Sequence, residues 1–433
     1  MERLENLYQK FIDAECSIAT DTRKITDKGG LFFALSGPNF NGNQFAMQAL
    51  NKGCSFAIVD DASFVKDDRM ILVEDALSTL QLMANHHRKH FTIPILAITG
   101  SNGKTTTKEL LRTCFETKWQ THSTVGNLNN QIGVPLTLLG LNSNHEIAIV
   151  EIGTNSPGEI AALAELTEPT DALITSIGKA HLEGLGSLDG IAAEKLSLFK
   201  YTRDHKGRLF CNEGSAFIKK DMELHSYENK VCYSNETSEL LTIQLKKSFP
   251  RIEAIVNNEL NLNSSLFGKY NFLNIVAGLT VASAFGLDLA RCVDAINDMS
   301  LDNNRTQTIK KESGSTIYLD AYNANPTSMT AAIQAFEESD HPDKWLIIGD
   351  MFELGADEIA EHQTIVNLLD DYKWETVILV GKLFGQTFKA ADKHYFDTTE
   401  EAEHWLSQQT IMNKEILIKA SRGMKLERLL EVL

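Results

Sequence analysis

The sequence predicts an α/β protein of three domains: a small N-terminal α/β domain, a central domain built on a parallel sheet, and a C-terminal Rossmann-like α/β domain. Near-continuous apolar runs recur along the chain, as in parallel strands that helices cover on both faces. Sequence of helical character follows these runs, and 433 residues are enough for two or three domains. We place the three domains at residues 1–92, 93–303 and 304–433.

The N-terminal domain is expected to alternate short strands with helices. Its opening stretch, MERLENLYQKFI, has no basic segment followed by an apolar core, so a signal peptide is not predicted. Its apolar residues recur instead at the spacing of an amphipathic helix, at Leu4, Leu7, Phe11 and Ile12. The runs GLFFAL (30–35) and SFAIVD (55–60) are predicted strands, and LSTLQLMANHHRKHF (77–91) is a predicted helix with a basic C-terminal end.

Apolar runs of strand length also define the central and C-terminal domains. Pro94 marks the expected entry to the central domain, whose strands are ILAITG (95–100), EIAIVEIG (146–153) and DALITSIG (171–178). The strands expected in the C-terminal domain are KWLIIGD (344–350), TVILVGKLF (376–384) and EILIKAS (415–421). Both domains should therefore carry parallel sheets with helices between the strands.

Composition excludes several classes of protein. The net charge is −17 with only 41 Lys and Arg residues, which argues against a general nucleic-acid binder but leaves room for a local basic pocket. No apolar run is long enough to span a membrane. No CxxC pair is present, so we expect reduced, mostly buried thiols of a cytoplasmic protein at Cys16, Cys54, Cys114, Cys211, Cys232 and Cys292.

A glycine loop follows the first central strand. The run ILAIT leads into Gly100-Ser101-Asn102-Gly103-Lys104-Thr105, and TTKELLRTCF continues with helical character. In such a loop, N–H groups at the helix N-terminus surround phosphate oxygens, Lys104 neutralises the outer phosphates and the Thr105 hydroxyl reaches Mg²⁺. Only two residues separate the glycines, where the common pattern has four. The central domain is thus predicted to be a P-loop, ATPase-like domain, and the loop alone leaves kinases, ATPases and ligases open.

Polar residues at the following strand ends predict a metal site beside this loop. Glu151 ends one strand, His181 lies in the loop after the next, and Lys195 lies on the helix LDGIAAEKLSLF. Taken alone, each is more often a solvated charge, a structural histidine or a surface lysine. Their joint position at strand ends, where open α/β sheets bind ligands, favours a functional role.

Seven motifs then follow one another in the order seen in the Mur ligases of peptidoglycan synthesis. They are GSNGKTTT, NLNNQIGVPLTLL, EIGTNSPGEI, AHLEGLGSLDGIAAEK, DAYNANPTSM, GDMFELG and ASRGMKLE. With the N-terminal stretch TDTRKITDKGGLFFALSGPNFNGNQFA, the resemblance covers nearly the whole chain. YNANP together with GDMFELG most resembles the members that add the dipeptide D-alanyl-D-alanine, and the DNPR-like stretch expected of diaminopimelate-adding members is absent.

The resemblance implies an ATP-dependent carboxylate–amine ligase that joins UDP-MurNAc-tripeptide to D-Ala-D-Ala through an acyl phosphate. It implies ATP, two Mg²⁺ ions and a CO₂-derived carbamate on Lys195. The implied catalytic residues are Lys104, Glu151, His181 and Lys195, and the implied metal ligands are Thr105, Glu151, His181 and Lys195. The implied ATP-binding residues are Gly100, Ser101, Asn102, Gly103, Lys104, Thr105, Thr106, Asn271, Asn274, Arg305 and Asp320.

The resemblance also implies positions for the other two substrates. Thr22 and Arg23 resemble the family's uridine-nucleotide site, whereas Asn41-Gly42-Asn43 stands where the family often has Asp-Gly-His. Asp350 is expected to face the dipeptide, although an N-cap is an equal interpretation. The full set expected to bind substrate is Thr22, Arg23, Asn41, Asn43, Asn129, Asn130, Asn155, Tyr322, Asn323, Asn325, Asp350, Ser421 and Arg422.

Other functions stay open at this point. Another Mur ligase or a folylpolyglutamate synthetase-like ligase would use a different amine, and a P-loop small-molecule kinase would stop at a phosphorylated product. A non-catalytic nucleotide-binding module would not require the full set of polar residues. We further expect a cytoplasmic monomer with small-molecule substrates, no nucleic-acid partner and no membrane insertion.

Overall fold

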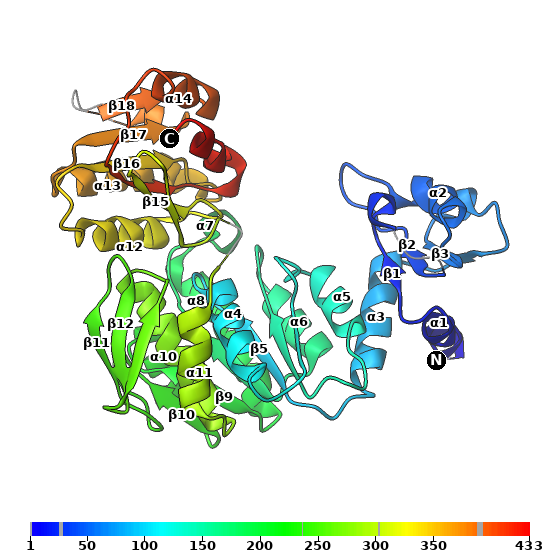
Figure 1. Cartoon of the computed structure of the whole chain (residues 1–433). Coiled ribbons are helices and arrows are strands. Elements are labelled where there is room, and N and C mark those ends of the chain that lie inside the picture. The colour runs from blue at the N-terminus through cyan, green and yellow to red at the C-terminus, as the bar shows by residue number, and fades with distance from the viewer. Residues whose placement is uncertain (1, 26–28, 236, 302–303, 388–392) are drawn as a thin grey trace. The chain divides into compact units, whose positions relative to one another are not determined.

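The computed structural model describes residues 2–25, 29–235, 237–301, 304–387 and 393–433 (Figure 1). Contacts divide the chain into two units. The first contains Met1–Ala97, Gln120–Gly153 and Ala161–Thr170, and the second contains Ile98–Trp119, Thr154–Ile160 and Asp171–Leu433. The limits of the three domains stay predictions, and the one between 303 and 304 adjoins residues 302–303, which lie outside the described residues.

The N-terminal α/β domain has the strands and helices that the sequence predicts. A parallel sheet of order β1-β2-β3-β4 consists of Ile18–Ala19, Leu31–Phe33, Phe56–Val59 and Met70–Leu72. The helices are α1 (Glu2–Asp13), α2 (Ala46–Asn51) and α3 (Ala76–Arg88). Phe32, Ala57 and Val59 of the sheet and Leu50 of α2 share one buried cluster, so α2 covers one face of the sheet.

The central sheet has the order β10-β9-β8-β5-β7-β6. Its strands are β5 (Ile95–Thr99), β6 (Thr121–Ser123), β7 (Ile147–Glu151), β8 (Asp171–Ile174), β9 (Arg208–Asn212) and β10 (Lys230–Tyr233). β6 pairs with β7, β8 with β9, and β9 with β10, all in parallel, and every residue of β5, β7 and β8 is buried. The predictions of three apolar, parallel strands here are therefore confirmed.

Helices separate these strands along the chain. They are α4 (Lys104–Phe115), α5 (Gly133–Leu139), α6 (Glu159–Thr167), α7 (Leu182–Leu185), α8 (Leu188–Asp204) and α9 (Ala216–Leu224). Two more helices, α10 (Lys269–Ala284) and α11 (Leu289–Asp298), come later in the chain. α4 begins directly after the glycine loop that follows β5, as the sequence predicts.

One part of the central region departs from the expected strand–helix alternation. Between α9 and α10, the strands β11 (Ile243–Lys247), β12 (Ile252–Val256) and β13 (Leu260–Ser264) form an antiparallel sheet, so the prediction of continued alternation is wrong there. Asn257 and Asn258 both have positive φ, which suits a tight turn between β12 and β13. Burial alternates along β12, a period-2 pattern typical of a sheet with one covered face.

The C-terminal domain is a second layered α/β structure. Its sheet has the order β14-β15-β19-β16-β17-β18, with β14 antiparallel at one edge and the others parallel. The strands are β14 (Gln307–Lys310), β15 (Thr316–Asp320), β16 (Lys344–Gly349), β17 (Thr376–Val380), β18 (Lys393–Phe396) and β19 (Glu415–Lys419), and the helices are α12 (Pro326–Glu337), α13 (Glu358–Asp370) and α14 (Thr399–Leu406). The three strands predicted here, β16, β17 and β19, are confirmed.

Successive residues of these strands enter two different cores. Leu346 of β16 packs in a cluster with α12 and α13, whereas Ile347 packs in a cluster with α14 and the C-terminal residues Leu426 and Leu429. The sheet is thus covered on both faces, and only its edges are open to ligands. Because β15, β16, β17 and β19 are parallel, the loops that follow them meet at one edge of the sheet.

All six cysteines are free thiols, five of them buried and Cys16 exposed, which agrees with the sequence prediction. Over the described ranges, no helix combines the length and apolarity that crossing a bilayer requires.

Candidate active site

Two glycines allow the phosphate loop to fit tightly against its neighbours. A Cβ on Gly100 would lie 2.0 Å from Oγ1 of Thr175, and a Cβ on Gly103 would lie 2.4 Å from Oδ1 of Asn274. Gly103 also has a φ of 82°, in the left-handed region that favours glycine, immediately before α4. Both glycines of GSNG are therefore required by the backbone path.

Hydrogen bonds fasten the loop to the segment after β8. The Ser101 hydroxyl donates to the carbonyl of Gly178 at 2.7 Å, and the backbone N–H of Asn102 donates to the hydroxyl of Ser176 at 2.9 Å. Thr175 donates in turn to the carbonyl of Asn102 at 2.6 Å. The loop is thus held in shape before any nucleotide binds, which lowers the ordering cost of binding. Thr175 and Ser176 were not predicted from the sequence, because their role depends on the end of β8 lying next to the phosphate loop.

Lys104 and the first turn of α4 complete the phosphate loop. Nζ of Lys104 donates to the carbonyl of Gly100 at 2.6 Å, so the ammonium folds back over the loop. The first N–H groups of a helix lack intrahelical acceptors and carry a partial positive charge. Lys104, Thr105 and Thr106 lie at the start of α4, where the sequence places them, and the binding of a phosphate by their N–H groups stays a prediction.

The helix α8 buries Lys195 on its inner face. Lys195 is only 1 % exposed. Burial, followed by the positive charge of Lys104, lowers the pKa of the Lys195 ammonium to about 7, and Glu194 opposes this shift. The Glu194 carboxylate is itself engaged, because it accepts the N–H groups of Gly158 and Ile160 at 2.7 Å each. Lys195 is therefore no surface lysine, and near pH 7 a large fraction of its amine is uncharged.

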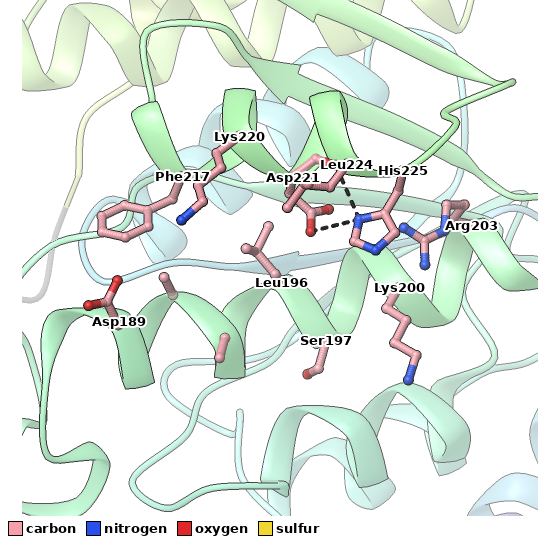
Figure 2. Close-up of a pocket in the computed structure, with 12 residues that line it drawn as sticks. Asp189, Leu196, Ser197, Lys200, Arg203, Phe217, Lys220, Asp221, Leu224 and His225 are labelled. Carbon is pink, nitrogen blue, oxygen red and sulfur yellow. Dashed lines mark hydrogen bonds and ion pairs between the residues drawn. The ribbon is translucent and has the colours of Figure 1, made fainter.

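The outer face of α8 lines a separate open groove. This groove, of about 600 Å³, lies between α8 and α9, and Figure 2 shows Lys200 and Ser197 on one wall and Lys220 and Leu224 on the other. Among the residues drawn in Figure 2, one ion pair is marked, between His225 and Asp221 at 3.1 Å. None of the sequence-predicted site residues lines the groove. The groove and Lys195 both belong to α8, but Lys195 does not line the groove.

His181 meets a carboxylate of the C-terminal domain. Its Nδ1 lies 2.5 Å from Oε2 of Glu353, within ion-pair distance although not aligned for a hydrogen bond, and the histidine lowers the pKa of Glu353. Both residues have positive φ. The N–H of Glu183 donates to the carbonyl of Glu353 at 3.2 Å, and Lys179 pairs with Glu361 at 2.5 Å. The loop after β8 is thus tied to the segment after β16, a contact that sequence reasoning missed.

Glu151 belongs to the first unit, whereas Thr105, His181 and Lys195 belong to the second. Its side chain is buried at the end of β7, and Oε1 accepts the Nδ2 donor of Asn129 at 2.9 Å. Asn130, by contrast, uses Oδ1 to cap the N–H groups of Ile132 and Gly133. Asn129 thus orients the predicted metal ligand, and Asn130 shapes the start of α5. In the described part of the chain, no three His, Cys, Asp or Glu side chains form a ready metal cluster.

The predicted adenine-side residues connect α10 to the phosphate loop. Asn274 donates to Oδ1 of Asn271 at 3.1 Å and lies against Gly103. Asn271 donates to the hydroxyl of Thr306 at 3.3 Å, which links α10 to the start of the C-terminal domain. Asp320, at the end of β15, pairs at 2.5 Å with Nζ of the buried Lys419. Lys419 was not singled out from the sequence, where it stands within an apolar run.

The loops at the carboxyl edge of the C-terminal sheet hold most of the predicted dipeptide residues. Asn325 caps α12 through a capping box and donates to Oδ1 of Asn102 in the phosphate loop at 2.8 Å. The Ser421 hydroxyl accepts the N–H of Phe352 at 3.1 Å, and the Asn323 carbonyl accepts Nζ of Lys419 at 3.3 Å. These contacts place the YNANP segment between the phosphate loop and the C-terminal sheet.

Asp350 caps a turn of the backbone. Its two carboxylate oxygens accept the N–H groups of Leu383 and Phe384 at 3.0 Å each, and burial raises its pKa. Asp350 is not the N-cap residue of a following helix, since the N-cap of α13 is Asp357, so the N-cap interpretation is wrong. Contact with a dipeptide stays a prediction. Asn155 is exposed, and its carbonyl lies so close to Gly184 that a Cβ there would approach it to 1.8 Å.

The predicted uridine-nucleotide residues are partly engaged within the N-terminal domain. The Thr22 hydroxyl donates to Oε1 of Gln48 at 2.8 Å, whereas the exposed Arg23 pairs with Asp21 at 2.8 Å. Asn43 is buried and donates to Oδ1 of Asp60 at 2.7 Å. Asn41 accepts the Asn43 N–H and caps the turn. The Asn-Gly-Asn departure is thus stabilised internally by Asp60, a partner that the sequence did not identify.

Comparison with known families identifies both of the larger parts of the chain. Residues 98–282 match the Mur ligase middle domain, and residues 304–422 match the Mur ligase, glutamate ligase domain. The chain is 33% identical to a UDP-N-acetylmuramoyl-tripeptide–D-alanyl-D-alanine ligase of Bacillus subtilis, with 96% of this chain and 92% of that protein covered.

Solved structures agree with the sequence matches. A crystal structure of MurF from Acinetobacter baumannii superposes with a TM-score of 0.86 at 28% identity, covering 96% of this chain and 92% of that one. The MurF ligase from Thermotoga maritima in complex with ADP gives a TM-score of 0.83 at 25% identity, with 96% of each chain covered. The predicted α/β architecture, with a parallel-sheet middle domain and a C-terminal α/β domain, is confirmed.

Proposed function

This chain belongs to the Mur ligase family, and we propose that it joins D-alanyl-D-alanine to UDP-N-acetylmuramoyl-tripeptide in an ATP-dependent reaction of peptidoglycan precursor synthesis. The observation that carries the proposal is the similarity, over 96% of the chain, to a ligase named for this reaction. The local geometry supports it, because hydrogen bonds hold the phosphate loop in shape and Asn325, after β15 of the C-terminal sheet, contacts that loop.

The reaction starts with activation of a carboxylate. An amide forms from a carboxylate only after an oxygen becomes a good leaving group, and transfer of the γ-phosphoryl group of ATP to the tripeptide's terminal carboxylate supplies one. Lys104 and the N–H groups at the start of α4 would offset the charge that spreads over the transferred group. The products of this step are ADP and an acyl phosphate.

The amine of the dipeptide completes the reaction. Its nitrogen attacks the acyl carbon, a tetrahedral intermediate forms, and phosphate leaves as the amide bond is made and a proton is lost. Water competes with the amine for the acyl phosphate, so the site must exclude it. The contact of Asn325 with Asn102 joins the YNANP segment to the phosphate loop, and the contact of Glu353 with His181 joins the segment after β16 to the loop after β8. Closure of the domains around the substrates would exclude water.

Magnesium fits the predicted donor set. The Thr105 hydroxyl and the buried Glu151 carboxylate offer hard oxygen atoms, the donor type that Mg²⁺ prefers, and His181 would add a ring nitrogen. When bound, the ion supplies positive charge at the nucleotide phosphates. Asn129 would keep the Glu151 carboxylate oriented for this role.

A CO₂-derived carbamate on Lys195 also fits. CO₂ reacts with a neutral amine, forming an N–C bond and releasing a proton, and a pKa of about 7 makes that neutral amine abundant at physiological pH. The modification would convert a buried cation beside Lys104 into an anion and so remove a repulsion. It would also supply oxygen donors for a second Mg²⁺.

The other substrates are assigned by domain. Thr22 and Arg23 of the N-terminal domain would meet the uridine nucleotide, and Arg422 with the YNANP loop would meet the dipeptide. The side-chain contacts of Asn41, Asn43 and Asn130 favour roles in shaping their loops. A cytoplasmic, monomeric enzyme is part of the proposal, and free buried thiols support the reducing compartment.

A panel of acceptors tests this proposal. D-Ala-D-Ala should support phosphate release at least about 10²-fold better than D-Ala, L-Lys, diaminopimelate or L-Glu. A site whose polar groups bind both ends of a dipeptide keeps some of those groups unpaired when a single amino acid binds, and this costs binding energy. Initial rates with each amine at equal concentration, with UDP-MurNAc-tripeptide and ATP present, give the comparison. A single amino acid as preferred acceptor would favour another Mur ligase or a folylpolyglutamate synthetase-like enzyme, and rates independent of any amine would favour a kinase.

A further inference from the structure

Two arginines from distant parts of the chain meet on the side chain of Tyr322. The guanidinium carbon of Arg305 lies 3.6 Å from the centre of the Tyr322 ring, and that of Arg422 lies 5.0 Å from it. Nη1 of Arg422 also donates to the Tyr322 hydroxyl at 3.2 Å. Tyr322 therefore holds one arginine by its ring face and the other by both ring and hydroxyl.

Among the described residues, these two guanidiniums differ from several other arginines in having no carboxylate partner. In the described ranges, no ion pair involves Arg305 or Arg422, although this chain has a net charge of −17. Asp or Glu side chains pair with Arg23, Arg69, Arg112, Arg208 and Arg428. Two like charges on one ring repel each other, and the interaction with the ring offsets only part of that cost. An oxyanion bound to either arginine would relieve the repulsion.

The two arginines belong to segments with different neighbours. Arg305 precedes Thr306, whose hydroxyl accepts Nδ2 of Asn271, and Asn271 is bonded to Asn274 against the phosphate loop. Arg305 is thus anchored on the nucleotide side. Arg422 follows β19 and Ser421 at the carboxyl edge of the C-terminal sheet, where α/β sheets receive ligands.

We infer that Tyr322 is a positioning residue shared by both substrate sites: its ring holds Arg305 for an oxyanion of the nucleotide, and its hydroxyl holds Arg422 for the carboxylate of the incoming dipeptide. This inference rests on the proposed function for the identity of the second substrate. The inferred role requires no contact between Tyr322 and the reacting atoms. Its role is to restrict two flexible side chains to the rotamers that binding needs.

Two substitutions separate the ring from the hydroxyl. Tyr322→Phe removes only the bond to Arg422, so the KM for D-Ala-D-Ala should rise about tenfold while kcat and the dissociation constant of a non-hydrolysable ATP analogue change less than about twofold. Tyr322→Leu removes the ring as well, so the analogue should also bind several-fold more weakly. The matched control is Tyr372→Phe in the segment before β17, at the opposite edge of the same sheet, which should alter neither constant.

A modified dipeptide tests the chemistry of the acceptor. D-Ala-D-Ala amide lacks the carboxylate, so wild-type protein should use it poorly, and Tyr322→Phe should change its KM much less than that of D-Ala-D-Ala. The inference is overturned if Tyr322→Phe affects both acceptors equally or neither, or if Tyr322→Leu leaves analogue binding unchanged in a folded protein. If wild-type protein uses no dipeptide, the proposed function fails, while analogue titration of Tyr322→Leu still decides the Arg305 half.

Discussion

Replacement of Lys104 by alanine is expected to lower kcat for ligation about 10³-fold while the protein stays folded. The side chain is flexible and partly exposed, and its contact with the Gly100 carbonyl lies within the loop, so the fold should not depend on it. The transferred phosphoryl group, however, spreads negative charge toward the loop, and no other side chain of GSNGKTTT is a cation.

Steady-state rates of phosphate release, with thermal unfolding as a check on folding, provide the measurement. Lys118→Ala is the matched control, because this exposed lysine lies just beyond the other end of α4 and should leave the rate unchanged. Near-wild-type turnover of Lys104→Ala would show that GSNGKTTT does not hold the phosphates.

Replacement of Lys195 by alanine is expected to reduce turnover at least about 10²-fold. An ammonium would repel a divalent ion, whereas a carbamate offers anionic oxygens to it. A small carboxylic acid such as acetate or formate should partly restore turnover, because its carboxylate can occupy the space of the missing carbamate. The rescue should saturate with acid concentration and fail with chloride at equal ionic strength, which separates ligand replacement from screening.

The modification itself has a readout that does not depend on activity. With ¹³C-labelled bicarbonate, wild-type protein should show a carbamate carbon resonance whose intensity grows as the pH rises through about 7, because deprotonation of Lys195 produces the reactive amine. The resonance should vanish in Lys195→Ala and persist in Lys200→Ala, the matched control on the groove face of α8 (Figure 2). Full activity of Lys195→Ala without added acid would mean that the second metal site must be assigned to other residues.

The sequence alone predicted those strands and loops whose pattern lies within one short segment of the chain. Apolar runs such as ILAIT and KWLIIG are buried along their whole length, so their composition alone distinguishes them. The glycines of GSNG are fixed by steric contacts that the motif implies. The antiparallel strands β11–β13 escaped prediction because they alternate polar with apolar residues and lack the continuous apolar run of the parallel strands.

Contacts between distant segments could not be predicted in the same way. The pairs His181–Glu353, Asp320–Lys419 and Asn43–Asp60 depend on which strand ends meet. The order of strands in a sheet cannot be predicted from the composition of each strand alone. The sequence was enough to place Lys195 on a helix. Its lowered pKa arises from burial and from the charge of Lys104, and both depend on the folded structure.

The central claim is that ATP hydrolysis is coupled to one particular amide bond, and mass spectrometry of the products tests it most directly. UDP-MurNAc-tripeptide, D-Ala-D-Ala, ATP and Mg²⁺ should yield ADP, phosphate and a UDP-MurNAc-pentapeptide heavier than the tripeptide by one dipeptide less one water. The new bond should join the carboxylate end of the tripeptide to the amine of D-Ala-D-Ala. A phosphorylated product that accumulates equally without the dipeptide, or no pentapeptide at all, would contradict the account.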